Sequence, residues 1–364
     1  MRKIALGLVS QLLWLSPSYG TEQDLESRIK QLESEIAINQ EQAADFDHKL
    51  NNSVSISGYA DVEAIRSSEA GSKPGFGIHH MSLFFKKVID PKWRFFSEVE
   101  YEDGTQIAFE DTGDCTKCSG AVYLESMNFD FAWSPELGFR AGRFFTPAGI
   151  WSVDHYPPFV PTQQIPLHIR EIFPQVTDGA MVFGSRLIDG SFVNYNLYVG
   201  NGESNRGNED SNSAKAIGAK GSVTLPYLGL LQVGASMYHD KMNDSTTKTV
   251  LGLDTKMKIG ALSIQSEYAK GKYSPDAATK YDRNGFYAQF LYDIAKLTLG
   301  YRFDVYNPDT AKTNAGENVN SLIVNYHVSK DIVLKLEHHL FSFDDSTTKS
   351  FNKTIASVAV NLGN

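Results

Sequence analysis

The sequence predicts an all-β transmembrane barrel of about sixteen antiparallel strands, preceded by a short α-helical coiled coil. The stretch from Lys296 to Tyr306, KLTLGYRFDVY, shows the pattern behind this prediction. Every second residue from Leu297 onward is apolar, and most residues between them are polar or charged. Because side chains on a strand alternate between two faces, one face of this strand is apolar and the other is polar. A soluble β-sandwich shows the same alternation around a dry core, so length, repetition and connections must separate the two folds.

Those three features favour the membrane barrel. About sixteen alternating runs follow one another after Ser53, an even number as in single-chain bacterial barrels. Strands of about 9–11 residues can cross a bilayer, and no run of about 18 apolar residues follows the N-terminus. Short turns such as Ile89–Lys92 alternate with longer polar loops such as residues 103–120. We therefore expect residues 51–364 to form a barrel in a bacterial outer membrane, with lipid outside and water inside.

The first twenty residues have the features of a secretory signal peptide. Arg2 and Lys3 precede the apolar stretch Ile4–Leu15, and Gly20 is a small residue suited to the cleavage site. A buried N-terminal helix is the alternative, against which the polar run after Gly20 argues. Cleavage would remove two of the 34 basic residues and none of the 43 acidic ones, changing the net charge from −9 to −11. An acidic chain without a basic block is a poor binder of nucleic acid.

Residues 21–50 change period and predict a periplasmic coiled coil. Apolar residues recur at alternating spacings of four and three, with Glu and Lys between them. Leu and then Ile at the two core positions favours three or more strands, and one Asn interrupts the core as register-fixing polar residues do. We expect a homotrimer; an amphipathic helix packed on its own domain is the alternative. The core residues are Leu25, Ile29, Leu32, Ile36, Asn39, Ala43, Phe46 and Leu50.

Cys115 and Cys118 form a CxxC pair in the second long loop. In an oxidising compartment a small disulfide is the default, and free thiols or metal binding are the alternatives. Two thiolates alone do not make a zinc site, and a redox role would need a βαβ context that is absent from this pattern.

The third long loop, residues 146–177, differs from the others. It holds five prolines between Pro157 and Pro174 and many large apolar residues, which an exposed loop rarely carries. We expect it to fold into the barrel and narrow the lumen; an outer lid or a subunit contact is the alternative. The charged or titratable candidates for the constriction are Asp154, His155, His168, Arg170 and Glu171.

Charges on the inward face of the predicted strands would set ion preference. The inward cations are Lys86, Arg94, Arg140, Lys220, Lys256, Lys258, Arg302 and Lys335. The inward acids are Asp61, Glu63, Glu98, Glu100, Asp130, Asp254, Glu267, Asp304 and Glu337. The two sets nearly balance, so both anion and cation preference stay open.

The segment GRFFTPAGIW resembles a strand-end signature, Gly-x-Phe-x-x-Pro-x-Gly, of the phosphate-selective porin O/P family. The matching residues are Gly142, Phe144, Pro147 and Gly149. The organisation of nearly the whole mature chain, with a signal, a coiled coil and sixteen strands, is similar to that family. The resemblance implies a trimeric passive channel with an inward third loop. Because the inward charges balance, it does not by itself imply phosphate selectivity.

The function these patterns favour is passive diffusion of small hydrophilic solutes or ions, with anions such as phosphate among the candidates. Lipid, further copies of the chain and solutes in transit would be its only partners, and no cofactor is expected. An enzyme is disfavoured because neither G-x-S-x-G nor HExxH occurs. We also expect no metal site, since His79–His80 and His338–His339 would each place one ring on each strand face. The alternative function is a structural or adhesive barrel tethering another envelope layer through its coiled coil.

Overall fold

The computed structural model describes residues 54–104, 120–203, 210, 212–226, 230–242, 245–276 and 278–363. The chain divides into two compact units, Met1–Asn51 and Asn52–Asn364, and the described residues all belong to the second. The expected signal peptide, the coiled coil and the Cys115–Cys118 disulfide lie outside the described residues.

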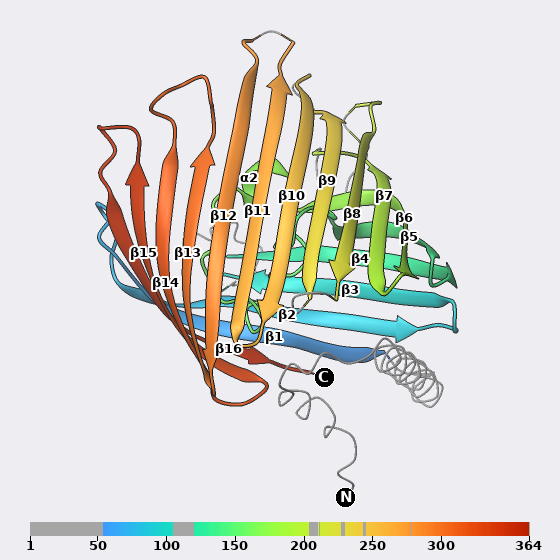
Figure 1. Cartoon of the computed structure of the whole chain (residues 1–364), viewed down its shortest axis with the longest axis horizontal. Helices are drawn as coiled ribbons and strands as arrows, with labels where there is room; N and C mark the ends of the chain where they lie inside the picture. The colour runs from blue at the N-terminus through green and yellow to red at the C-terminus, as the bar shows by residue number, and fades with distance from the viewer. Residues whose placement is uncertain are drawn as a thin grey trace, which may run out of the picture. The chain divides into compact units, whose positions relative to one another are not determined.

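Sixteen antiparallel strands close into one barrel, with each strand paired to its neighbours in the chain and β16 paired back to β1 (Figure 1). One short helix, α2, precedes β6. The elements are β1 (Ser55–Ser67), β2 (Gly75–Val88), β3 (Trp93–Glu102), β4 (Ala121–Ser134), β5 (Leu137–Phe145), α2 (Ile169–Ile172), β6 (Val176–Ile188), β7 (Ser191–Gly200), β8 (Ala216–Leu225), β9 (Leu231–Lys241), β10 (Thr247–Ile259), β11 (Leu262–Ser274), β12 (Tyr281–Ile294), β13 (Leu297–Asn307), β14 (Glu317–His327), β15 (Ile332–Phe343) and β16 (Phe351–Asn361).

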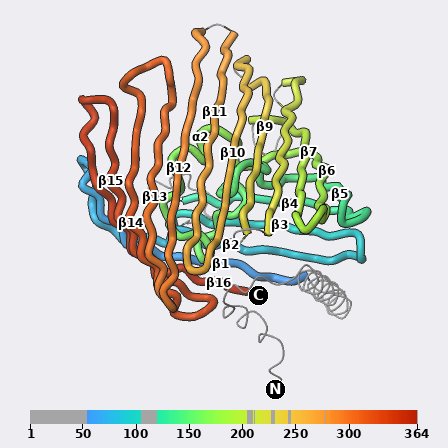
Figure 2. The backbone as a smooth tube through the Cα atoms, in the orientation of Figure 1, coloured from blue at the N-terminus to red at the C-terminus, as the bar shows by residue number. Residues whose placement is uncertain are grey.

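The short connections are built from turn residues that match the twist of the strands. β6 and β7 are joined by Asp189 and Gly190, both with positive φ (47° and 75°). Two such residues make the type I′ turn that tight hairpins favour. Figure 2 shows the short connections as sharp turns of the tube at one end of the barrel, whereas the connections at the other end loop more widely. The prediction of a barrel of about sixteen antiparallel strands is confirmed, and the alternative of two stacked sheets is wrong.

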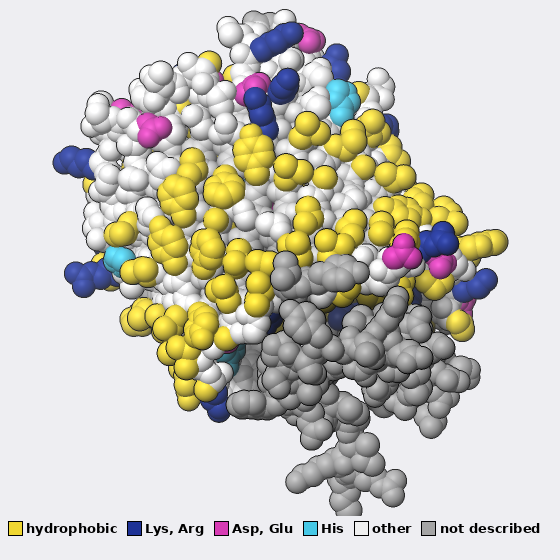
Figure 3. All heavy atoms as spheres, viewed as in Figure 1, with side chains coloured by type: hydrophobic (Ala, Val, Ile, Leu, Met, Phe, Trp, Pro, Cys, Tyr) yellow, Lys and Arg dark blue, Asp and Glu magenta, His cyan; other side chains and the backbone are white. Residues whose placement is uncertain are grey.

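Alternation between the two faces follows the sequence pattern. On β10, Leu251 and Leu253 are 63% and 60% exposed on the outer face, whereas Val250 and Asp254 are 0% and 3% exposed on the inner face. Apolar side chains form a belt across the visible wall, with most charged side chains near its margins (Figure 3). On β6, the buried Met181 marks the inward face. Among the described residues, no helix is long and apolar enough to cross a bilayer.

We expect Leu253→Arg, near the middle of β10, to lower the free energy of unfolding in lipid vesicles by about 2–4 kcal/mol. This is the cost of arginine on the lipid face at the bilayer midplane. The control is Ser329→Arg in the exposed turn between β14 and β15, where the change should be close to zero. Denaturant unfolding followed by tryptophan fluorescence measures both. Equal losses for the two variants would contradict an outer face in contact with lipid.

Candidate functional site

The segment between β5 and β6, residues 146–175, is called the inner loop here. It contacts inward-facing residues of strands that lie far apart around the wall, including β1, β3, β8, β11 and β13–β16. α2 lies at its C-terminal end and contacts β11 and β12 (Figure 1). These contacts place the segment within the ring of strands.

The inner loop starts from a short neck. Thr146 and Thr177 pair through their hydroxyls at 2.9 Å, and the Thr146 N–H donates to the Gln175 carbonyl at 3.0 Å. Gly149 follows with φ +59°, and any side chain there would run into the Glu267 carboxylate of β11. The backbone conformation therefore favours glycine, and a side chain at this position would displace the Glu267 carboxylate. The Glu267 carboxylate then accepts from the Trp151 N–H at 2.9 Å.

Buried charged side chains satisfy the backbone of the middle of the inner loop. Arg302 on β13 donates to Thr162 Oγ1 at 2.5 Å and to the Gln164 carbonyl at 2.8 Å. Lys335 on β15 donates to the carbonyls of Pro157 and Val160. Because proline has no N–H, this proline-rich segment has more backbone acceptors than donors, and the cations supply the missing donors.

Carboxylates and amides of the wall complete this network. Glu337 on β15 accepts from the Gln163 N–H at 2.6 Å, and Asn325 on β14 donates to the Pro161 carbonyl at 2.9 Å. The Gln163 side chain reaches Asp61 on β1 at 2.9 Å and Ser357 on β16 at 3.0 Å. The loop is thus hydrogen-bonded to both strands that close the barrel.

The predicted lumen charges fall into groups with different surroundings. Nine are buried, several of them against the inner loop: Arg302, Lys335, Asp61, Glu98, Glu100, Asp254, Glu267, Asp304 and Glu337. Four are half-buried: Arg140 and Asp130, which form a two-point ion pair with each other, Lys220, which donates to the Gly149 carbonyl, and Glu63. Four are exposed: Lys86, Arg94, Lys256 and Lys258. Of these four, Lys256 and Lys258 lie 3.9 Å and 3.3 Å from the carboxylates of Asp154 and Asp293.

The five constriction candidates do not gather at one point. Asp154, Arg170 and Glu171 are exposed, and Asp154 lies 3.9 Å from Lys256. His168 is buried, and its ring packs on Tyr287 of β12 with centroids 6.0 Å apart. His155 is half-buried.

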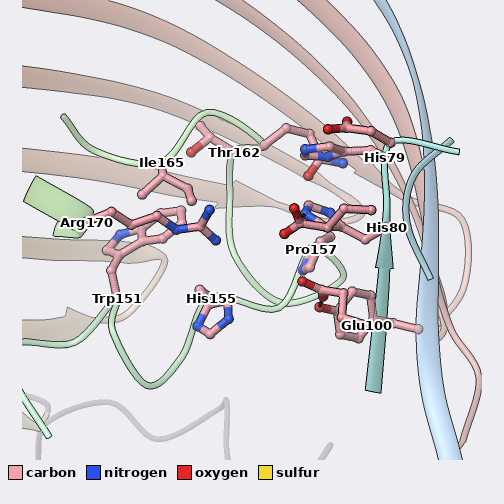
Figure 4. A pocket seen from close by; sticks show the side chains of 13 residues that line it. His79, His80, Glu100, Trp151, His155, Pro157, Thr162, Ile165 and Arg170 are labelled. Carbon is pink, nitrogen blue, oxygen red and sulfur yellow. Dashed lines mark hydrogen bonds and ion pairs between the residues drawn. The ribbon is translucent and has the colours of Figure 1, made fainter. Parts of the chain in front are cut away.

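Two of the candidates, His155 and Arg170, line a cavity of about 200 Å³ between the inner loop and β1–β3. Across it stand the side chains of His79, His80 and Glu100 (Figure 4). Glu102 and Asp103 also line the cavity. One side therefore carries a guanidinium and the other carries imidazoles and carboxyl groups, so both walls of this space are polar.

The two histidines of the inner loop are neutral at neutral pH. Burial, together with the nearby Arg170 guanidinium, lowers the pKa of His155 to about 4. Burial and then Arg302 lower the pKa of His168 to about 4. At neutral pH the charge of the loop at the cavity is therefore that of Arg170.

The expectation that His79 and His80 point to opposite faces is wrong. Asp61 pairs with His80 and the next residue, Val62, pairs with Ile78, so His79 is an extra residue in β2. Such a β-bulge redirects the side chains beside it. Both Nδ1 atoms consequently lie 3.1 Å from the Asp61 carboxylate. Alternation alone gives no sign of a bulge, which is why the sequence missed it.

The other histidine pair does separate. His338 Nδ1 lies 2.9 Å from Thr354 Oγ1, whereas the buried His339 lies between Ser321 and Glu337. Residues that sequence reasoning did not single out also take part in the site. Gln163 and Tyr156 are polar positions within an apolar loop, and Tyr156 donates to Glu98 at 3.4 Å. Only that contrast with their neighbours could have identified them.

No family model matches the sequence. An uncharacterized protein of Aquifex aeolicus (strain VF5) is 28% identical over 162 residues, which is 44% of this chain. The match spans 35% of that relative's length.

Three solved structures share the barrel. The anion-selective porin from Comamonas acidovorans has a TM-score of 0.64 and 12% identity, covering 85% of this chain and 99% of that one. OmpF of Salmonella typhi, in complex with daunomycin, has a TM-score of 0.61 and 14% identity, covering 86% of this chain and 98% of that one. The trimer form of OmpT, an outer membrane protein of Vibrio cholerae, has a TM-score of 0.58 and 14% identity, covering 85% of this chain and 99% of that one. At these identities the likeness shows a common fold.

We expect Arg302→Ala to lower the free energy of unfolding by about 3–5 kcal/mol. The change leaves Asp304 buried without the guanidinium that lies 2.8 Å from it, and breaking a buried pair from one side costs this much. The matched control is Arg66→Ala, which removes an exposed cation of β1 and should change stability by no more than about 0.5 kcal/mol. Denaturant unfolding in micelles measures both, and similar losses would show that Arg302 does not hold the loop.

We expect acid destabilisation to be smaller in His168→Phe than in the wild type. The imidazole has a pKa near 6.5 when unfolded and about 4 when folded, so the unfolded chain binds more protons between these values. The stabilisation is complete above about pH 6.5 and is lost as the pH falls toward 4, by about 3 kcal/mol. Phenylalanine keeps an aromatic ring packed against Tyr287 and cannot titrate.

The measurement is the free energy of unfolding at pH 7 and at pH 4.5. The control is His327→Phe, which replaces an exposed imidazole. An unchanged pH dependence in His168→Phe would contradict a neutral buried ring.

Proposed function

We propose that this chain is an outer-membrane porin, a passive diffusion channel for small hydrophilic solutes or ions. An apolar outer belt around a closed sheet suits lipid, and a polar inner face suits water. Sixteen strands enclose more space than their own inward side chains fill. The porins that share the fold support this class of function. The proposal assigns no catalytic step to any residue.

The observation that carries the proposal is the set of hydrogen bonds between the inner loop and the inner face of the strands, because a loop held there would narrow the lumen. Buried side chains such as Arg302, Lys335 and Glu337 hold its backbone to the wall. The space between the loop and β1–β3 has Arg170 on the loop side and the carboxyl groups of Glu102 and Asp103 on the wall side. A solute that passes this point keeps polar partners and so avoids the cost of desolvation.

We further propose that the channel is weakly selective, with Arg170 as the residue that favours anions, phosphate among them. Arg170 is the exposed cation of the inner loop at the cavity, whereas the opposite wall carries Glu100 and Glu102. Charged rings of either sign set selectivity in such pores, and here the two signs oppose each other.

We propose a homotrimer whose contacts include a coiled coil formed by residues 21–50, and membership of the phosphate-selective porin O/P family. The heptad stripe of residues 21–50 and the segment from Gly142 to Trp151 support these two points. The trimer form of a barrel with the same fold is consistent with the first. We also propose export through the periplasm, which the signal-like pattern of residues 1–20 supports.

Planar-bilayer recording tests the channel. We expect single-channel steps in groups of three, and a reversal potential in a salt gradient that moves toward cation preference in Arg170→Ala. Arg170→Lys should keep most of the wild-type value because it keeps the charge. Lys349→Ala, in the exposed loop between β15 and β16, is the control and should change nothing. A wild-type protein that gives no conductance would overturn the proposal.

A further inference from the structure

A cluster of imidazoles and carboxylates stands in the wall of the cavity, opposite the inner loop. We propose that Asp61, His79 and His80 bind a divalent first-row transition metal ion such as Zn²⁺ or Cu²⁺. The three residues come from β1 and β2. One ligand atom from each lies within 4.8 Å of the others.

The spacing of the ligand atoms suits such an ion. Zinc binds histidine nitrogen and carboxylate oxygen at about 2.0–2.2 Å, so neighbouring ligands of a tetrahedral site lie about 3.3–3.5 Å apart. His79 Nδ1 and His80 Nδ1 lie 3.1 Å from Oδ2 and Oδ1 of Asp61, respectively. Small side-chain rotations would bring all three atoms to one ion.

The β-bulge makes the pairing possible. Two consecutive residues of a regular strand point to opposite faces, which would leave one imidazole in lipid. Because His79 is the extra residue, the two rings instead lie with centroids 3.6 Å apart and planes at 46°. The bulge therefore places two consecutive imidazoles on the side of the wall that lines the cavity.

Further carboxylates surround the pair and can complete the coordination. Glu63 lies 3.7 Å from His79 Nδ1, and Glu102 lies 3.9 Å from His80 Nε2. His80 also belongs to a second cluster with Glu100 and Glu102. This negative surrounding favours a cation. Two imidazoles with carboxylate oxygen suit zinc, copper, nickel or cobalt, whereas magnesium and calcium prefer oxygen alone.

The site is open to water on one side and supported on the other. The side chains of His79 and His80 are 23% and 14% exposed, and both line the cavity that faces Arg170 (Figure 4). The Asp61 side chain is fully buried and accepts from the Gln163 amide of the inner loop at 2.9 Å. A second partner of this kind orients a ligating carboxylate.

A metal-free explanation uses the same distances. Asp61 could accept hydrogen bonds from two imidazoles and hold both rings in place without an ion. The two explanations differ in what a spectroscopic probe would report, because only coordination puts ring nitrogens on a metal.

The test uses the full chain in detergent micelles with Cu²⁺ as the probe. All samples are treated with iodoacetamide so that Cys115 and Cys118 cannot bind metal. We expect one equivalent of Cu²⁺ whose electron paramagnetic resonance spectrum shows coupling to two nitrogens. Zn²⁺ should compete for it.

His79→Gln and His80→Gln should each remove one nitrogen coupling and weaken Cu²⁺ and Zn²⁺ binding by about tenfold or more. The matched control is His338→Gln, which changes an imidazole paired with Thr354 and should keep the wild-type spectrum and affinity. A wild-type spectrum without nitrogen coupling, or identical binding in all variants, would overturn the proposal. The wild-type spectrum alone can do so, so the result does not depend on the folding of a variant.

A consequence for conductance rests on the proposed channel function. An ion at His79 and His80 adds positive charge beside the cavity, so Zn²⁺ should reduce cation conductance in the wild type and not in His80→Gln. Nitrogen-coupled Cu²⁺ binding in a protein that gives no conductance would support the metal site while overturning the channel. Conductance without nitrogen-coupled Cu²⁺ binding would support the channel while overturning the metal site.

Discussion

The pairing of β16 with β1 is the constraint on which the rest of the structure depends. A bilayer offers no water to an unpaired backbone group, so an open sheet edge cannot persist there. The two strands come from opposite ends of the barrel unit and pair from Tyr59↔Asn361 to Ser67↔Lys353. Once this register is set, each strand has a fixed outer and inner face. The alternating residues of β10, apolar outward and buried inward, follow from it.

Closure creates a second problem inside the barrel, which the inward charges solve. A proline-rich loop placed in a narrow space exposes carbonyls that have no partners of their own. Arg302 and Lys335 supply donors to these carbonyls, and Glu267 and Glu337 accept from loop amides. Buried charges are tolerable only when they are paired in this way. Much of the inner charge therefore stabilises the loop.

The roles of the inward charges also show how far the structure could be predicted from the sequence. The period of two predicts the strands, their faces and their number, because those depend on local patterning. The prolines predict an unusual third loop. Which charges the loop would cover depends on contacts between residues more than a hundred positions apart, such as Arg302 with Thr162. The bulge at His79 depends on the register of β1 against β2, and the sequence of β2 alone does not specify it.

Asp61 links the closure of the barrel to both the inner loop and the histidine pair. It lies on β1 within the register with β16, where it pairs with Ala359, and its carboxylate meets both imidazoles of the bulge and the Gln163 amide of the inner loop. A side chain placed by barrel closure thus positions the loop on one side and the histidine pair on the other. The charge of the cavity is consequently set by register and packing. The net charge of −9 does not decide it, because acids such as Glu337 are already engaged by the loop.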